Sequence, residues 1–281
     1  MGANDTGIIG WPVSHSLSPL IQNRWRQQYG VGGSYELMPI EPEHLVEKIK
    51  KTKASGLRGF NVTVPHKESI IPFLDTVDDI AHHIGAVNTV VREGSTWRGT
   101  NTDAYGFITA LKKSTTASAK QDLLKNVLVL GAGGSCRAVI VALQEAGAES
   151  ITLTNRTKEK ADALAAEFGV KSLPWEDKEG FLRKTTLLVN TTVLGMVGHP
   201  PLVLSLNQLN PSAVVYDLVY APTPTEIVRQ ARSKHIFALN GLGMLIYQAQ
   251  RAFEEWHGVL PQVEEALTAL LMTEIQKRKN L

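Results

Sequence analysis

Short runs of leucine and β-branched residues alternate along this chain with longer segments whose apolar residues recur every three or four positions. The first pattern is typical of buried strands and the second of amphipathic helices. Strands are expected at 6–10, 34–40, 58–64, 126–130, 150–154, 186–190, 213–219 and 236–239. Helical segments separate most of these runs, so the pattern predicts an α/β fold with largely parallel sheets.

Local residue chemistry sets several of the expected boundaries. Ser18 is a typical N-cap, and Pro19 is a typical first helical residue. Further helices are expected to begin at prolines, namely Pro42, Pro65, Pro222, Pro224 and Pro261. Residues 86–92 and 96–101 flank Glu93-Gly94-Ser95 and predict a β-hairpin.

A glycine-rich turn follows the strand at 126–130. Gly131-Ala132-Gly133-Gly134 leads into an alanine-rich helical segment that stops at Gly147. A strand, a tight turn and a helix in this order leave backbone N–H groups free at a helix N-terminus. These groups can bind a pyrophosphate. Alternatively, these glycines could form only a turn with no ligand. The nucleotide site is favoured by the strands on either side of the turn and by the basic residues that follow the second strand.

The residues after the next strand bear on the choice of cofactor. An NAD-binding unit carries an acidic residue about 20 positions past the glycines, where it binds the ribose 2′-hydroxyl. This chain has no acid there and instead carries Arg156, with Lys158 and Lys160 close behind. Such a basic cluster suits a 2′-phosphate, so NADP is the predicted cofactor.

Composition narrows the class of protein. The 281 residues suffice for two domains. Lys and Arg total 29 against 27 Asp and Glu, and no basic block is long enough to follow a nucleic-acid backbone. The single cysteine fits a reducing compartment, and no apolar run approaches the length of a membrane span. A cytoplasmic protein that binds neither nucleic acid nor membrane, and that is a monomer or homodimer, is therefore expected.

One predicted strand has a polar face. Phe60, Val62 and Val64 alternate with Asn61 and Thr63, so the amide and hydroxyl share one side of the strand, as in the wall of a polar pocket. Lys67 follows at the expected first turn of the helix opened by Pro65. An exposed lysine is the simpler reading of that residue. Asp103 could likewise be only a first-turn acid, stabilised by the helix dipole.

Taken together, the motifs resemble the shikimate dehydrogenase family. The match runs from Ser14-His15-Ser16-Leu17-Ser18-Pro19 to Met244-Leu245-Ile246-Tyr247-Gln248-Ala249 and so covers nearly the whole chain. The matching segments between them are 61–67, 85–89, 101–103, 131–134, 155–157 and 190–196. No single segment is decisive, but the ordered series is highly specific.

The resemblance implies two domains with the chemistry in the cleft between them. Residues 1–105 plus 244–281 would form an α/β substrate-binding domain, with the C-terminal helices returning to it. Residues 106–243 would form a Rossmann-like NADP domain. The implied reaction is the reversible, NADPH-dependent reduction of 3-dehydroshikimate to shikimate, a step of aromatic amino acid biosynthesis.

The resemblance also implies roles for individual residues. Lys67 and Asp103 would be the catalytic pair, the lysine donating to the reacting oxygen and the aspartate orienting it. Ser14 and Ser16 would bind the substrate carboxylate. The other substrate-binding residues would be Asn61, Thr63, Asn88, Tyr216 and Gln248. The cofactor-binding residues would be Gly131, Ala132, Gly133, Gly134, Asn155, Arg156, Thr157, Lys160, Thr191, Met196, Gly241 and Met244.

Three positions depart from the family pattern. Cys136 replaces the third small residue of the glycine motif, and Asn240 stands where an aspartate is common. Lys160 stands where many relatives have a second arginine, which keeps the charge and loses the planar fork.

Two other functions stay open. A dual quinate/shikimate dehydrogenase is one, because a pocket discriminates poorly against an analogue that merely adds a hydroxyl. A non-catalytic NADP-binding sensor is the other. Such a sensor would be expected to lose the lysine or the aspartate, and both residues are present.

Overall fold

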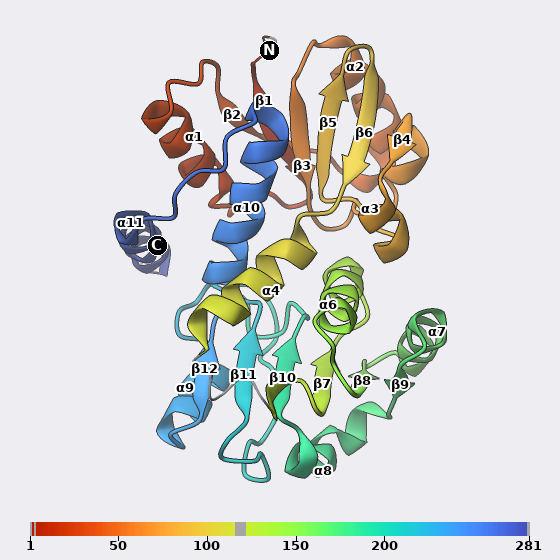
Figure 1. The fold of residues 1–281 in the computed structure, drawn as a ribbon, viewed down its shortest axis with the longest axis vertical. Coiled ribbons are helices and arrows are strands. Elements are labelled where there is room, and N and C mark those ends of the chain that lie inside the picture. The colour runs from red at the N-terminus through yellow and green to blue at the C-terminus, as the bar shows by residue number, and fades with distance from the viewer. Residues whose placement is uncertain (1, 3, 116–121, 280–281) are drawn as a thin grey trace. The chain divides into compact units, whose positions relative to one another are not determined.

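The computed structural model describes residues 2, 4–115 and 122–279. The Ser-, Thr-, Ala- and Lys-rich segment at 114–121, whose composition predicts a linker, therefore lies mostly outside the described residues. The chain divides into two compact units (Figure 1). The first comprises Met1–Gly106 and Leu245–Leu267, and the second comprises Phe107–Met244 and Thr268–Leu281. This division places residues 268–281 with the second unit, whereas the sequence-based prediction puts all of 244–281 with the first.

The first unit is built on a mixed six-stranded sheet. Its strand order is β2 (Tyr35–Pro39), β1 (Thr6–Gly10), β3 (Gly59–Val62), β5 (Thr89–Glu93), β6 (Thr96–Thr100) and β4 (Thr76–Val77). The β1 strand pairs in parallel with β2 and β3, and β5 and β6 form the predicted hairpin. The remaining elements are α1 (Ser18–Gln28), η1 (Pro42–His44), α2 (Leu45–Ala54), η2 (Ile71–Phe73), α3 (Asp79–Ile84), most of α10 (Leu242–His257) and the first turn of α4 (Asp103–Ser114).

The two faces of this sheet are covered differently. Phe60 and Val62 pack with Ile49 of α2 on one face. Ile8, Tyr35 and Val91 pack with Ala252 and Trp256 on the other. This second face is the one that α10 covers (Figure 1). The predicted alternation is therefore confirmed for Phe60 and Val62, with Asn61 between them on the opposite side of the strand. It is wrong for Val64, because β3 ends at Val62 and Val64 is 55% exposed.

The second unit contains a six-stranded parallel sheet. Its strand order is β12 (Phe237–Leu239), β11 (Val214–Asp217), β10 (Leu187–Asn190), β7 (Val127–Leu130), β8 (Ile151–Thr154) and β9 (Lys171–Ser172). The helical elements are α6 (Gly134–Glu145), α7 (Lys158–Phe168), η3 (Trp175–Asp177), α8 (Lys178–Phe181), η4 (Leu182–Lys184), α9 (Glu226–Ser233) and α11 (Glu265–Lys279).

This strand order reverses direction between β7 and β10, as in doubly wound dinucleotide-binding folds. The central strands are completely buried, which explains their continuous apolar sequences. The carboxyl ends of β7 and β10 lie at the point of reversal, where such folds bind their ligands. The predicted α/β class with two domains is confirmed.

Several predicted helix starts are wrong. Leu17, not Ser18, is the cap of α1, and the Ser16 hydroxyl instead accepts a hydrogen bond from the Ser18 N–H at 3.2 Å. No helix begins at Pro65, because the Lys67 carbonyl accepts a hydrogen bond from Val87 N–H at 2.8 Å and is unavailable to a helix. The helices expected at Pro222 and Pro261 begin later, at Glu226 and Glu265.

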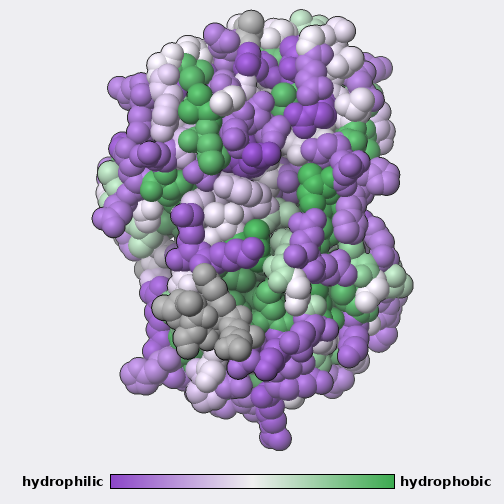
Figure 2. Space-filling model, viewed as in Figure 1, coloured by the Kyte–Doolittle hydropathy of each residue, from purple (hydrophilic) through white to green (hydrophobic). Residues whose placement is uncertain are grey.

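On the face drawn in Figure 2, hydrophilic residues dominate and hydrophobic ones form small scattered groups. Among the described residues, no helix combines the length and apolar character needed to cross a membrane.

Candidate active site

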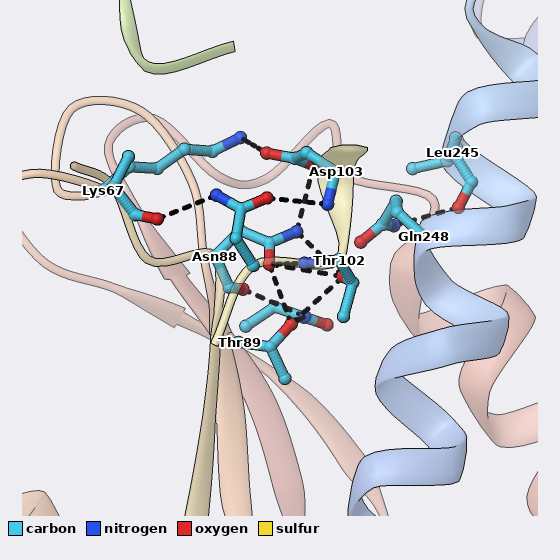
Figure 3. Close-up of polar contacts among 10 residues, drawn as sticks. Lys67, Asn88, Thr89, Thr102, Asp103, Leu245 and Gln248 are labelled. Atoms are coloured by element: carbon cyan, nitrogen blue, oxygen red, sulfur yellow. Dashed lines mark hydrogen bonds and ion pairs between the residues drawn. The ribbon is translucent and has the colours of Figure 1, made fainter. Parts of the chain in front are cut away.

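A buried ion pair lies in the first unit. The Lys67 ammonium donates to Asp103 Oδ2 at 2.5 Å, and the two side chains are only 11% and 7% exposed (Figure 3). Other ion pairs of this unit are more open, for example Lys53–Asp75, whose side chains are 36% and 35% exposed. Burying two charges is costly unless the remaining polar atoms are also satisfied. The Lys67–Asp103 pair is therefore a candidate for function.

Asn88 supplies the other polar contact of the aspartate. Its side-chain Nδ2 donates to Asp103 Oδ1 at 2.9 Å and to Thr102 Oγ1 at 3.0 Å. Its Oδ1 accepts hydrogen bonds from Thr102 N–H at 2.7 Å and from Thr89 Oγ1 at 3.0 Å. Both carboxylate oxygens of Asp103 are thus engaged by separate donors, which fixes the plane of the carboxylate (Figure 3).

Backbone hydrogen bonds hold the two members of the pair in place. Lys67 lies in a turn whose carbonyl is tied to Val87. Asp103 begins α4, and its N–H donates to the Asn101 side chain at 2.9 Å. The Asn101 amide in turn donates to the Ala86 carbonyl at 2.8 Å. Residues 86–88 therefore contact both the lysine turn and the aspartate helix, and these contacts bring together two side chains that are far apart in sequence.

The predicted polar residues of β3 differ in their availability. Asn61 is 4% exposed, and its Nδ2 donates to the Asn88 carbonyl at 3.1 Å and to Thr89 Oγ1 at 3.0 Å. Its Oδ1 accepts from the Tyr35 hydroxyl at 2.7 Å. Both N–H donors of Asn61 are used inside the protein. Toward a ligand, the side chain could therefore only accept a hydrogen bond, at Oδ1. Thr63 is half-buried.

Ser14, Ser16 and Gln248 are the other predicted substrate residues of this unit. Ser14 is exposed, whereas Ser16 is half-buried. Gln248 lies on α10, is 8% exposed and donates to the Leu245 carbonyl at 2.9 Å (Figure 3). That bond uses one of its two N–H groups and leaves its carbonyl oxygen available.

Tyr216 does not have the position expected of a ligand-binding residue. It lies within β11 of the second unit, is 0% exposed, and stacks on Phe107 with the ring centroids 5.0 Å apart. Burial raises the pKa of its phenol well above the usual range. We therefore assign Tyr216 to the core instead of the substrate. Tyr220, in the loop after the strand, is only half-buried and lies beyond the carboxyl end of β11, the side on which such folds bind ligands.

The glycine turn of the second unit has the geometry of a phosphate-binding loop. Gly131 has φ +116°, and a Cβ there would come within 2.5 Å of Thr191 Oγ1, so only glycine fits. Thr191 follows β10 and bonds back to the Leu130 carbonyl, both from its N–H at 2.9 Å and from its hydroxyl at 2.8 Å. At Gly133, the cap of α6, a Cβ would point into open space. Gly134 begins that helix.

The basic cluster after β8 includes two side chains with no ion-pair partner among the described residues. Arg156 and Lys160 are both exposed and free in this sense. Lys158 is different, because it pairs with Asp162. Asn155 donates to the Thr157 carbonyl at 2.9 Å and shapes the turn into α7. Two free cations beside a helix N-terminus suit a phosphate group.

The departures at Cys136 and Asn240 have local explanations. Cys136 is completely buried, and its thiol is small enough to lie close to Thr191. Burial raises the pKa of this thiol to about 12. Asn240 accepts from Leu242 N–H at 3.1 Å at the start of α10 and donates to Thr223 Oγ1 at 2.9 Å. Nearby Gly241 has no room for a side chain, because a Cβ would lie 1.8 Å from the Leu218 carbonyl oxygen.

The other two predicted cofactor residues, Met196 and Met244, lie in the loop after β10 and in α10. Met196 is half-buried and Met244 is buried. Among the described residues, the side chains grouped closely enough for a metal ion are Glu41, Glu43 and His44, which are largely exposed and include neither member of the ion pair.

Family models cover most of the chain. Residues 8–90 match the shikimate dehydrogenase substrate-binding domain. Residues 114–194 match the shikimate/quinate 5-dehydrogenase model, and residues 241–271 match the shikimate 5′-dehydrogenase C-terminal domain.

Individual proteins agree with these models. The shikimate dehydrogenase (NADP(+)) of Paramagnetospirillum magneticum is 43% identical over 270 residues, which is 95% of this chain and 97% of that protein. The crystal structure of the Thermus thermophilus enzyme in complex with NADP(H) and shikimate has a TM-score of 0.81, with 37% identity and 98% coverage of each chain. Quinate dehydrogenase from Corynebacterium glutamicum, in complex with NAD, has a TM-score of 0.87 and 27% identity, covering 96% of this chain and 99% of its own. On this similarity, with substrate-binding and dehydrogenase domains in the same order, the chain belongs to the shikimate dehydrogenase family.

Proposed function

We propose that this protein is an NADP-dependent shikimate dehydrogenase that interconverts shikimate and 3-dehydroshikimate. The observation that carries the proposal is the buried Lys67–Asp103 pair, supported by Asn88. Family membership fixes the type of chemistry, and the pair provides the acid and base that this chemistry needs.

The pair handles the proton of the reaction. In the oxidation direction, a hydride leaves a ring carbon and a proton leaves the hydroxyl on the same carbon. Bound NADP is the hydride acceptor, and NADPH is the donor in the reverse direction. As the neutral amine, Lys67 takes up the hydroxyl proton and becomes an ammonium, which the Asp103 carboxylate holds by accepting a hydrogen bond; on reduction the Lys67 ammonium returns that proton to the carbonyl oxygen. The charge on Lys67 also stabilises the negative charge that develops on that oxygen.

The supporting residues keep the pair productive. Asn88 occupies Asp103 Oδ1, so Oδ2 is left for the lysine. An ammonium group has three N–H donors, and the bond to Asp103 leaves two of them for a substrate oxygen. We place the substrate carboxylate at Ser14 and Ser16, and we place Thr63 and Gln248 at the ring hydroxyls. Asn61 and Asn88 act mainly by shaping this wall, because their N–H groups are already used within the protein.

The residues of the second unit fit NADP. The required glycine at 131 and the open space at Gly133 leave room for a pyrophosphate at the start of α6. Arg156 and Lys160 provide free positive charge for a 2′-phosphate, and no acid stands at 155–157 to bind a 2′-hydroxyl. We therefore assign Gly131–Gly134 to the pyrophosphate and Arg156, with Lys160, to the 2′-phosphate. Asn155 and Thr157 complete this end of the site, and Thr191, Met196, Gly241 and Met244 are proposed for the nicotinamide end.

Quinate is the competing substrate, because a quinate dehydrogenase shares the fold and one matching family model covers both activities. Turnover of shikimate and of quinate, each with NADP and with NAD, separates the two functions. We expect kcat/KM to be highest for shikimate with NADP. Comparable values for the two acids would indicate dual specificity, and no turnover of shikimate with either cofactor would refute the proposal.

The cellular setting follows from the proposed reaction. Its substrates are small metabolites, and the single buried cysteine is compatible with a reducing compartment. We place the enzyme in the cytoplasm as a monomer or homodimer.

A further inference from the structure

Tyr35 is a buried residue on β2, the edge strand of the sheet in the first unit. It is 1% exposed, and its ring packs against Trp256 with the centroids 6.0 Å apart. Its backbone is fixed on both sides by Asn23, which accepts from Tyr35 N–H at 2.8 Å and donates to the Tyr35 carbonyl at 3.1 Å. The ring therefore has little freedom, and its hydroxyl has a fixed position.

The hydroxyl points at Asn61. It donates to Asn61 Oδ1 at 2.7 Å, across β1, which lies between the two strands. Burial raises the pKa of Tyr35 well above its usual range, so the hydroxyl keeps its proton and remains a donor. The bond satisfies a buried amide oxygen on a sheet face that carries apolar residues such as Ile8 and Val91 as well as Thr89. The Ser18 side chain is a second polar neighbour of the Tyr35 hydroxyl.

From Asn61 the hydrogen bonds continue in one direction to the candidate catalytic pair. Asn61 Nδ2 donates to Thr89 Oγ1 at 3.0 Å and to the Asn88 carbonyl at 3.1 Å. Thr89 has one hydroxyl proton, which it can donate to Asn88 Oδ1 at 3.0 Å. Asn88 Nδ2 donates to Asp103 at 2.9 Å. Each group is a donor to the next, so the orientation of one amide sets the orientation of the following group.

This directionality makes the first donor important. Without the Tyr35 hydroxyl, Asn61 Oδ1 has no hydrogen-bond donor among the residues that the structure describes, which costs the desolvation of that buried oxygen. Turning the amide over would place two N–H groups in the same apolar surroundings and would leave Thr89 without its donor. The cheapest response is a shift of Asn61 toward other partners, and that shift loosens Thr89 and Asn88.

We propose that Tyr35 is a positioning residue of the active site, which acts through Asn61, Thr89 and Asn88 to orient the Asp103 carboxylate toward Lys67. This inference rests on the proposed function, since it assigns Tyr35 a part in that reaction. Tyr35 does not itself contact the candidate catalytic pair; its nearest link to the pair is the amide of Asn61.

The test is the variant Tyr35→Phe in the full-length enzyme, which removes one hydroxyl and keeps the ring against Trp256. Steady-state kinetics with shikimate and NADP should show kcat lowered about tenfold, the equivalent of one misplaced hydrogen bond, with KM for NADP unchanged. The matched control is Tyr29→Phe. Tyr29 lies in the same unit, and its hydroxyl accepts from Gln262 N–H at 2.9 Å, away from the chain of bonds described above. This control should retain wild-type kcat.

A second pair of variants follows the chain of bonds from its other end. Asn61→Ala should lower kcat as Tyr35→Phe does, and the double variant should be no worse than Asn61→Ala alone. A Tyr35→Phe enzyme that melts at a lower temperature yet keeps wild-type kcat would overturn the inference, since Tyr35 would then be purely structural. So would fully additive losses in the double variant. Wild-type turnover of shikimate tests the proposed function separately, because it does not depend on Tyr35.

Discussion

Asn88 Nδ2 and Lys67 Nζ contact different oxygens of the same carboxylate, at 2.9 Å on Oδ1 and 2.5 Å on Oδ2 of Asp103. The aspartate is thus held by one neutral and one charged donor. A neutral amide fixes the plane of the carboxylate without competing with the lysine for charge. The arrangement explains why an acid at the first turn of a helix, a common feature by itself, has a specific partner here.

The substitution Asn88→Ala should lower kcat by about tenfold to 100-fold, because Asp103 Oδ1 loses its donor and the carboxylate can rotate. Thr102 N–H and Thr89 Oγ1 lose their acceptor as well, so the free energy of unfolding should fall by about 1–3 kcal/mol. Steady-state kinetics and denaturant unfolding measure the two effects. Loss of stability with unchanged kcat would mean that Asn88 supports the fold alone.

The preference for NADP over NAD should depend on Arg156 more than on Lys158. Arg156→Ala is expected to raise KM for NADP by about 10-fold to 100-fold, since a charge-assisted bond to a phosphate is lost, and to leave NAD kinetics nearly unchanged. Lys158→Ala is the matched control, because Lys158 is already paired with Asp162. It should have a small effect on both cofactors. Equal losses with NADP and NAD for Arg156→Ala would refute the assignment to the 2′-phosphate.

The glycine turn gives a prediction on stability. Gly131→Ala should destabilise the protein by about 1–3 kcal/mol, because the residue has positive φ and its Cβ would meet Thr191. Thermal or denaturant unfolding measures the change.

The matched control is Gly133→Ala, where φ is −111° and no atom lies within 4 Å of the added Cβ. This variant should unfold as the wild type does and should instead raise KM for NADP, since the methyl group would fill the space proposed for the pyrophosphate. A Gly133→Ala enzyme with unchanged cofactor kinetics would place the phosphates elsewhere.

Acid stability should depend on His257. Burial, with the charges of Arg26 and Arg58 adding to the effect, lowers its pKa from 6.5 to about 4. Between these two pH values His257 is protonated in the unfolded chain and neutral in the native protein. The free energy of unfolding therefore falls as the pH decreases from 6.5 toward 4. The side chain is only partly buried, and we expect this contribution to be about 1–2 kcal/mol. A His257→Gln variant, compared by denaturant unfolding at pH 7 and pH 5, should lose less stability over this interval than the wild type. An equal loss would assign the acid sensitivity to other groups.

Much of the fold follows from local sequence patterns. The buried runs at 127–130, 187–190 and 214–217 are strands. Gly169 ends α7 in a left-handed conformation, as is typical of a glycine that follows a helical pattern. The errors arise where a tertiary contact outweighs a local preference. Pro65 does not open a helix because the Lys67 carbonyl is bonded to Val87, a residue that no local pattern connects to it.

The site is less predictable than the fold. Lys67 and Asp103 are 36 positions apart, and their approach depends on hydrogen bonds made by residues 86–88 and 101. Tyr35 gives no signal in the sequence, since an aromatic residue in a strand usually belongs to the core. The burial of Tyr216 is equally hidden, because only the structure shows that its ring is stacked on Phe107 and has no exposed surface.

The catalytic role of Lys67 is tested by the Lys67→Ala variant, with shikimate turnover and shikimate binding measured on the same preparation. We expect kcat to fall by about 100-fold to 10,000-fold, as for loss of a general acid–base group, with little change in the dissociation constant for shikimate. Lys53→Ala is the control, because it removes the lysine of a more exposed ion pair in the same unit, and it should retain wild-type kcat. A Lys67→Ala enzyme that turns shikimate over at close to the wild-type rate would exclude Lys67 from the reaction.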